Sequence, residues 1–268
     1  MTIYISTAVM QCLSLEEAID VLASIWRGIE IGHSHLDQLD VLRALETLTR
    51  VLMHGKELDV ELSVAHMPMS HIENVFVESM DRGYEITRKF LEVYSRYGID
   101  IVVMHTIPLP IDISERMEQH IVRELEFNKR VFRYLDTVAK RLGIRIAVEN
   151  RLEKWIVGAL PLDLLEIVDG LESIGICIDT GHAHVNKLDV ESTVKLLRDR
   201  IVVAHVHDND GSRDQHLPPM MGSIDWYKVS KVLRGSIPIV LEISCKDSVE
   251  RCKNVAILSV EIGRKLFG

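Results

Sequence analysis

The chain has 268 residues, of which 47% are hydrophobic, and its formal net charge is −9. The length suits one large domain with a sizeable core, and the negative charge argues against a surface that is one general nucleic-acid footprint, because such surfaces are usually basic. No apolar run of about 18 residues occurs, and no basic segment followed by a long apolar one opens the chain, so we expect a cytoplasmic protein without a membrane span.

Short runs rich in isoleucine and valine predict eight β-strands. Such runs are typical of strands that are buried on both faces, as in parallel sheets. In chain order the predicted strands are Ile3–Val9, Gly28–Gly32, Val60–His66, Ile101–His105, Ile144–Glu149, Ile174–Asp179, Ile201–His207 and Ile237–Ile243.

Amphipathic segments of helical period lie between these strands. Ser14 and Ser114 stand where helix N-caps are expected, and Gly98 and Gly143 where C-caps are expected. The predicted helices are Leu15–Arg27, Leu36–Met53, Ser70–Tyr97, Ile113–Leu142, Pro161–Glu172, Val190–Arg200, Trp226–Leu233 and Ser248–Leu266.

Strand–helix alternation without a linker-like stretch predicts one α/β domain over residues 1–268, a single (β/α)8 TIM barrel. The alternative, a doubly wound sheet, usually carries a glycine-rich GxGxxG turn after its first strand, and the segment Ala8–Ser14 has none. In a barrel all strand carboxyl ends open onto one face, where we expect the active site.

Side chains that can bind a metal stand at the ends of the predicted strands from the third to the eighth. A carboxylate buried there without a partner would cost several kcal/mol, so its presence indicates a cation. Convergence of His, Asp and Glu in a concave pocket is typical of a divalent-metal site. The residues are His66, His105, Glu149, Asp179, His205, His207 and Glu242.

Two loops add further candidates. In Asp179-Thr180-Gly181-His182 we expect Gly181 to permit a sharp turn, so that both ligands face the opening. The polar loop from His207 to Asp225 adds Asp208, Asp214 and His216. Glu30, at the end of the second strand, is a weaker ligand candidate, because it could equally pair with a basic residue. His33, His35 and His184 are expected to line the mouth of the barrel.

The cysteines contain no CxxC pair, so a zinc–cysteine site is not expected. Cys177 and Cys245 lie in or just after predicted strands, and we interpret both as small buried hydrophobic side chains.

Together these segments resemble the xylose-isomerase-like TIM barrels, also called the AP endonuclease family 2 superfamily, from residue 3 to about 244. That superfamily includes sugar and sugar-phosphate isomerases and epimerases, inosose dehydratases and endonuclease IV. The motifs are Ala-His-Met-Pro, Val-Met-His-Thr, Ala-Val-Glu-Asn, Ile-Asp-Thr-Gly-His, His-Val-His-Asp-Asn-Asp-Gly, Arg-Asp-Gln-His-Leu-Pro-Pro, Gly-Ser-Ile-Asp-Trp and Leu-Glu-Ile-Ser.

The resemblance implies two metal-ligand sets. The isomerase branch holds one ion with residues that match Glu149, Asp179, His205 and Glu242. Endonuclease IV holds three zinc ions and adds residues that match His66, His105, His182, Asp214 and His216. Because this sequence has both sets, we expect one to three divalent ions per chain: zinc first, with manganese, cobalt or magnesium as alternatives.

The favoured hypothesis is a sugar or sugar-phosphate isomerase or epimerase. Glu149 and Glu242 would move a proton next to a metal-polarised carbonyl, and the substrate would contact His207, Asp208 and Arg151. The alternative is an endonuclease IV-like multinuclear zinc phosphodiesterase, acting on abasic DNA or on a small phosphoester.

The loops favour a small sugar-type substrate over nucleic acid. The segment His33–Asp37 contains no arginine or aromatic residue, and Met67-Pro68-Met69 stands where the DNA enzyme has an aromatic wedge. Met220-Met221-Gly222 also departs from the Gly-Glu-Gly of relatives. By analogy with such relatives we also expect a homo-oligomer.

Overall fold

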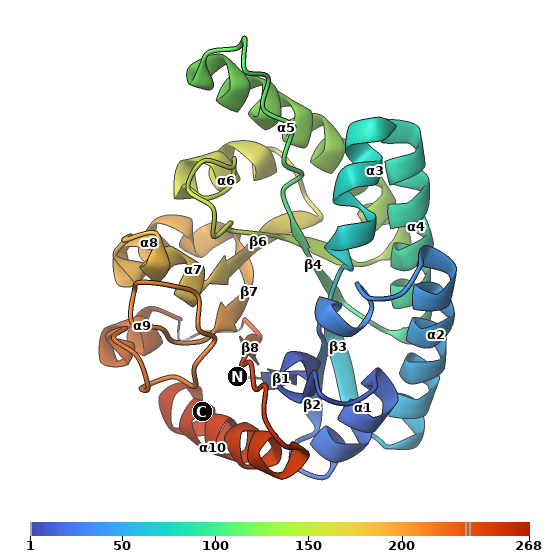
Figure 1. Cartoon of the computed structure of the whole chain (residues 1–268), viewed down its shortest axis with the longest axis vertical. Helices are drawn as coiled ribbons and strands as arrows, with labels where there is room; N and C mark the ends of the chain where they lie inside the picture. The colour runs from blue at the N-terminus through green and yellow to red at the C-terminus, as the bar shows by residue number, and fades with distance from the viewer. Residues whose placement is uncertain (1, 234, 236) are drawn as a thin grey trace.

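A computed structural model describes residues 2–233, 235 and 237–268, and its parallel strands close into a barrel in the order β1 to β8, with helices outside (Figure 1). The predicted TIM barrel is therefore confirmed. The strands are β1 (Ile3–Ser6), β2 (Gly28–Ile31), β3 (Glu61–His66), β4 (Ile101–His105), β5 (Arg145–Glu149), β6 (Ile174–Asp179), β7 (Ile201–Val206) and β8 (Ile239–Leu241).

The helices follow the predicted order. Those of the outer layer and the mouth are α1 (Leu15–Ala23), α2 (Val41–Glu57), α3 (Glu73–Glu78), α4 (Met80–Tyr97), α5 (Met117–Leu142), α6 (Pro161–Val168), α7 (Thr180–Val185), α8 (Val190–Leu197), α9 (Trp226–Leu233) and α10 (Val249–Phe267). Short 3-10 turns are η1 (Thr7–Met10), η2 (His33–His35), η3 (Met69–His71) and η4 (Arg198–Arg200). The predicted caps Ser14, Gly98 and Gly143 are confirmed.

Several predicted boundaries are wrong, and three of them have clear local reasons. The first strand ends at Ser6, whose hydroxyl accepts a hydrogen bond from Ala8 N and starts η1. The predicted helix Ser70–Tyr97 is divided at Ser79, which is extended and caps α4 through Arg82 N. Ser114 is held by the Asp112 carboxylate in a turn, so α5 begins only at Met117.

The barrel interior is filled below the strand ends. An apolar layer packs there, and at its base the Tyr4 hydroxyl donates a hydrogen bond to Glu61. The layer consists of Tyr4, Val64, Ile101, Val103, Ala147, Cys177, Val203 and Val240. Because side chains alternate along a strand, the last inward residue of this layer on each of β3 to β8 is followed two positions later by a residue at the mouth.

Cys245 and Cys252 form a disulfide between the segment after β8 and the first turn of α10. Cys245 is buried, as expected, but it does not act as a separate small hydrophobic side chain, because the chain turns back there and brings the two sulfur atoms together. Cys177 is buried and free, as predicted.

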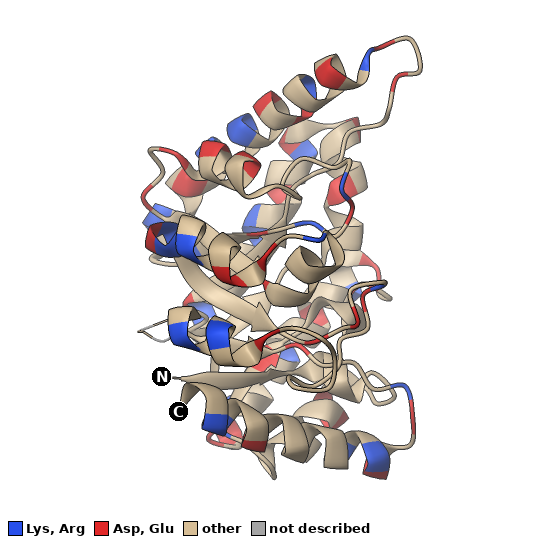
Figure 2. Ribbon diagram, turned by 90° about the vertical axis from the view of Figure 1, so that its left-hand side faces the viewer, with Lys and Arg blue, Asp and Glu red and all other residues tan. Residues whose placement is uncertain are grey.

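The outer surface is polar and mixed in charge. Lysine and arginine alternate with aspartate and glutamate along the helices (Figure 2). The first half of α5 and the loop before it extend beyond the rest of the barrel (Figure 1). Among the described residues, no helix combines the length and the apolar character needed to cross a membrane.

Candidate metal centre

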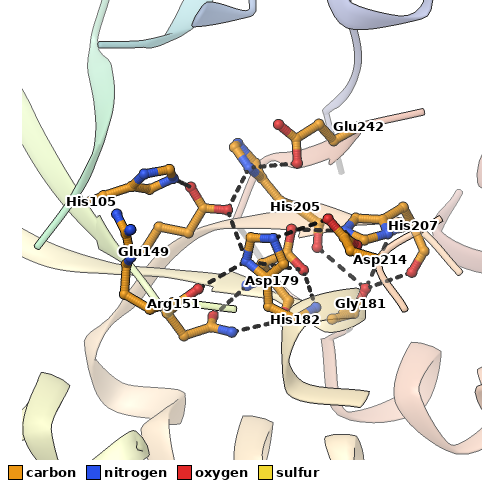
Figure 3. A network of polar contacts seen from close by, with 12 residues as sticks. His105, Glu149, Arg151, Asp179, Gly181, His182, His205, His207, Asp214 and Glu242 are labelled. Carbon is orange, nitrogen blue, oxygen red and sulfur yellow. Dashed lines mark hydrogen bonds and ion pairs between the residues drawn. The ribbon is translucent and has the colours of Figure 1, made fainter. Parts of the chain in front are cut away.

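Glu149, at the end of β5, lies at the centre of the converging strand ends (Figure 3). Its side chain is 1% exposed. Its Oε2 lies 3.0 Å from His66 Nε2 and 3.2 Å from His105 Nε2. His66, His105 and Glu149 form a first group whose ligand atoms lie within 4.8 Å of one another, which is close enough to hold one ion.

A second group, here called the central group, shares Glu149. It adds Asp179, His205 and Glu242, which are all buried, and its ligand atoms again lie within 4.8 Å of one another. His205 Nδ1 is 3.2 Å from Glu149 Oε1 and 3.3 Å from Glu242 Oε2. The Cys177 thiol lies just below, within the same distance of Glu149 and His205.

A third group consists of His182, His207, Asp214 and His216. Asp214 Oδ2 lies 2.8 Å from His216 Nε2 and 3.5 Å from His182 Nε2, and Asp214 Oδ1 lies 3.7 Å from His207 Nε2. The structure thus brings all the predicted ligands into the three groups and adds His207. That they bind ions remains a prediction.

Hydrogen bonds outside the groups fix several imidazole rings. His66 Nδ1 lies 2.9 Å from Met67 O, His182 Nδ1 lies 2.9 Å from Asn150 O, and His216 Nδ1 lies 2.8 Å from Glu242 O. A carbonyl oxygen only accepts, so each Nδ1 carries the hydrogen and each Nε2 faces its group. This is the usual arrangement of metal-binding histidines.

Opposite charges perturb the titration of these residues. Burial alone would raise the pKa of Glu149, but the charge of His205 and hydrogen bonds from His105, His205 and His66 hold it well below its usual range. Although burial opposes protonation of His216, its hydrogen bond with Asp214 and the nearby carboxylates raise its pKa to about 9. Because a ligand must lose such protons, ion binding here would release them.

The donor set fits divalent ions. It combines imidazole nitrogens with carboxylate oxygens, which are the ligands of zinc, manganese and related ions. In the third group, His207 Nδ1 and Asp214 Oδ1 are buried atoms without a hydrogen-bond partner among the described residues. Such unsatisfied polar atoms are rare in folded proteins and often mark a missing ion or water.

The groups open onto a cavity of about 270 Å³, which suits a small molecule. Besides the ligands, its lining includes His33, Arg151, Leu152 and Glu153. Arg151, which was predicted to contact the substrate, lines the cavity, but its guanidinium is already paired, 2.9 Å from Glu73 and 3.1 Å from Glu153. His33 lines the mouth as predicted, with Nδ1 2.6 Å from Asp37.

Asp208 and His207, which were predicted to contact the substrate, are both buried. Asp208 is fully buried and accepts hydrogen bonds from Trp226 Nε1 at 2.7 Å and from the main-chain nitrogen atoms of Asn209 and Ile224. Its oxygens hold the loop before α9, and contact of Asp208 with a substrate remains a prediction. His207 is fully buried, with its ring stacked on that of His216.

Gly181 has a different role from the expected one. It lies inside α7 and does not have a positive φ, and a β-carbon built on it would clash with the His207 ring. The missing side chain leaves the space that this ring occupies.

Two more buried residues belong to the site: Glu30, a weaker candidate that could have paired with a basic residue, and Asn150, which was not predicted. Glu30 Oε1 lies 2.9 Å from His205 Nε2. Asn150 ties β5 to β6, because its side chain accepts from Asp179 N at 2.6 Å and donates to Asp179 O at 3.0 Å. Asn150 directly follows Glu149 in the Ala-Val-Glu-Asn motif, and that position was its only signal.

Comparison with known proteins decides the family. The profile of the xylose isomerase-like TIM barrel family matches residues 20–257, which is most of the chain. The chain belongs to the xylose isomerase-like TIM barrel family. The resemblance seen in the sequence motifs is thereby confirmed.

Relatives within and around this family share the barrel. The uncharacterized protein MJ1311 of Methanocaldococcus jannaschii is 30% identical over 228 residues, which cover 82% of this chain and 74% of the relative. A D-tagatose 3-epimerase-like protein superposes with a TM-score of 0.81 at 23% identity, covering 99% of this chain and 97% of the other. The IOLI protein, solved with a bound zinc atom, superposes with a TM-score of 0.73 at 15% identity, covering 99% and 96%. At these identities, the two structural likenesses show the fold alone.

Proposed function

We propose that this member of the xylose isomerase-like family is a divalent-metal-dependent isomerase or epimerase of a small sugar-type substrate, with or without a phosphate. The observation that carries the proposal is the central group, in which three carboxylates and one imidazole meet beneath a cavity of about 270 Å³. Zinc is the first candidate ion. The likeness to a D-tagatose 3-epimerase-like protein supports the choice of substrate class.

The ion would polarise a carbonyl and its neighbouring hydroxyl group. Glu149, Asp179, His205 and Glu242 would hold it. The chain must then supply a group that removes a proton from the carbon next to that carbonyl and returns one.

Glu242 is better placed than Glu149 for that proton transfer. Both oxygens of Glu149 already accept hydrogen bonds from histidines. Glu242 lines the cavity, and its contacts with His205 and His216 both use Oε2, so Oε1 is free among the described contacts. We therefore assign the proton carrier to Glu242 first and to Glu149 second.

The test is proton exchange with solvent. Ion-loaded protein is incubated in D2O with ketopentoses, ketohexoses, inososes and their phosphates, and deuterium at the carbon next to the carbonyl is followed by NMR. We expect exchange with at least one substrate, and its loss in Glu242→Gln but not in the surface control Asp20→Asn. Absence of exchange with every substrate would contradict the proposal.

A second candidate is hydrolysis of a phosphoester. Glu149 belongs both to the first group and to the central group, so two ions there would share one carboxylate, as in two-metal hydrolases. Elemental analysis of protein purified without chelator separates the candidates. One ion per chain favours isomerisation, whereas two or three zinc ions with cleavage of bis(p-nitrophenyl) phosphate or of an abasic-site duplex favour hydrolysis.

The small cavity favours a small phosphoester over a DNA duplex within that second candidate. A homo-oligomer and a cytoplasmic location remain predictions. The Cys245–Cys252 disulfide fits a cytoplasmic location only in a hyperthermophile, because disulfides are rare in the cytoplasm of other organisms.

A further inference from the structure

Glu30 contacts the metal centre from behind His205. Its Oε1 lies 2.9 Å from His205 Nε2, and both side chains are 0% exposed. The other ring nitrogen, Nδ1, faces the central group, 3.2 Å from Glu149 Oε1 and 3.3 Å from Glu242 Oε2. His205 therefore stands between one carboxylate outside the group and two inside it.

This contact crosses the barrel. Glu30 comes from β2, which pairs with β1 and β3, whereas His205 comes from β7, which pairs with β6 and β8. No backbone pairing joins these two strands in the closed order. The side-chain contact is thus a specific link across the interior, directly beneath the site.

The hydrogen bond fixes which nitrogen can bind an ion. A carboxylate only accepts, so His205 Nε2 carries a hydrogen and the Nδ1 lone pair is left for the ion. His66, His182 and His216 show the opposite arrangement, because their Nδ1 atoms donate to main-chain carbonyls. His205 is the one histidine of the central group, and its outer partner is a carboxylate.

A carboxylate at this position is energetically costly unless a cation is near. Burying an ionised group away from water costs several kcal/mol, and Glu30 Oε2 has no hydrogen-bond partner among the described residues. A main-chain carbonyl would orient the ring without that cost, as it does for His66, His182 and His216. The added feature of Glu30 is its charge, which lies close to the ion position.

We propose that Glu30 is a positioning residue of the metal centre, which holds the His205 ring with Nδ1 toward the ion and adds negative charge that strengthens ion binding. This inference rests on the metal centre of the proposed function and not on its reaction. Carboxylate partners of this kind typically change metal affinity by roughly 10- to 100-fold when they are removed.

The test uses cobalt as a coloured probe. Full-length protein is stripped with a chelator and titrated with Co²⁺, and visible absorption gives both the affinity and the ligand geometry. Glu30→Gln keeps an oxygen acceptor for Nε2–H but loses the charge, so we expect roughly 10-fold weaker binding with an unchanged spectrum. Glu30→Ala loses both, so we expect roughly 100-fold weaker binding and a changed spectrum.

The matched control is Glu124→Gln. Glu124 is also buried, at 1% exposed, but it accepts hydrogen bonds from Leu109 N and Val157 N in the outer layer. We expect wild-type cobalt affinity for this variant. Wild-type affinity and spectrum in folded Glu30→Ala would overturn the inference and leave the proposed function standing, whereas absence of cobalt binding by the wild type would overturn both.

A measurement on the wild type avoids any folding defect of the variants. In protein labelled with 15N at histidine and loaded with zinc, nitrogen chemical shifts report which ring atom binds the ion. We expect His205 to bind through Nδ1 and to carry a hydrogen on Nε2. An ion on Nε2 of His205 would overturn the inference even if no variant could be purified.

Discussion

The imidazole ring of His207 occupies the space that a side chain at residue 181 would need. A β-carbon on Gly181 would lie 1.9 Å from His207 Cε1 and 2.3 Å from Nδ1. The ring cannot easily move away, because it is buried, bonded to Asp179 and stacked on His216 at 3.9 Å between centroids. The position of His207 in the third group thus depends on a residue without a side chain.

We therefore expect Gly181→Ala to displace His207. Overpacking of this kind costs about 1–3 kcal/mol, and the third group would lose one of its ligands. Urea denaturation and zinc content per chain measure the two effects. The control Gly263→Ala, in α10, meets only the flexible end of Leu241 at 3.1 Å, so equal losses in the two variants would count against this reading.

Asp208→Asn is expected to destabilise the loop before α9. An amide nitrogen cannot accept the hydrogen bonds that the carboxylate accepts from Trp226 Nε1 and Ile224 N, so a buried donor is left unpaired at a cost of about 1–3 kcal/mol. Thermal unfolding measures the loss, and the exposed residue Asp210 provides the control Asp210→Asn. A change in KM without a change in stability would instead indicate that Asp208 contacts the substrate.

The Asp37 carboxyl group should make the free energy of unfolding depend on pH. Burial would raise its pKa, but hydrogen bonds from His33 and Ser70 and the charge of His33 lower it. A carboxyl group with a lowered folded-state pKa stabilises the fold above its unfolded pKa of about 4, and that contribution is lost as the pH falls further. Urea denaturation at pH 7 and at pH 3 should therefore show a smaller loss for Asp37→Asn than for the wild type.

Asp163 provides a control because its pKa is shifted in the opposite direction from that of Asp37. Burial raises its pKa, so its carboxylate weakens the fold as the pH rises through that value. Asp163→Asn should remove this loss of stability at neutral pH. If both variants changed the pH dependence in the same direction, the assignment of the two shifts would be wrong.

The Cys245–Cys252 disulfide should contribute measurable stability. It joins residues separated by 7 positions, and closing a loop of that size stabilises the fold by about 2 kcal/mol in the chain-entropy relation. Thermal unfolding with and without a reductant should differ for the wild type and for Cys12→Ser. The double variant Cys245→Ser, Cys252→Ser should resemble the reduced wild type and should not respond to the reductant.

Local patterns in the sequence were sufficient for the barrel and for the convergence of side chains at the strand ends. Inward-facing residues recur at every second position of a strand, so an apolar run that ends in His66, Glu149 or Asp179 marks both the fold and the site. The position of every such residue follows from its own strand alone.

The features that could not be predicted depend on contacts between distant segments. The Glu30–His205 hydrogen bond joins residues 175 positions apart, and no local pattern specifies which of the buried groups will meet. The carboxylate of Asp208 is of a type that can bind a metal or a substrate, and only its contact with Trp226 shows that its oxygens are occupied.

The packed interior of the barrel affects the order in which the ion and the substrate bind. The apolar layer below the ligand groups and the Tyr4–Glu61 contact at its base leave the mouth as the route by which both ions and substrate reach the site through the described part of the chain. His105, Glu149, His182, Asp214, His216 and Glu242 line the cavity that a substrate would fill. An ion must then arrive before the substrate and can leave only after the product. A bound substrate would accordingly slow the capture of the ion by an external chelator, so the rate of ion exchange reports how long the cavity stays filled.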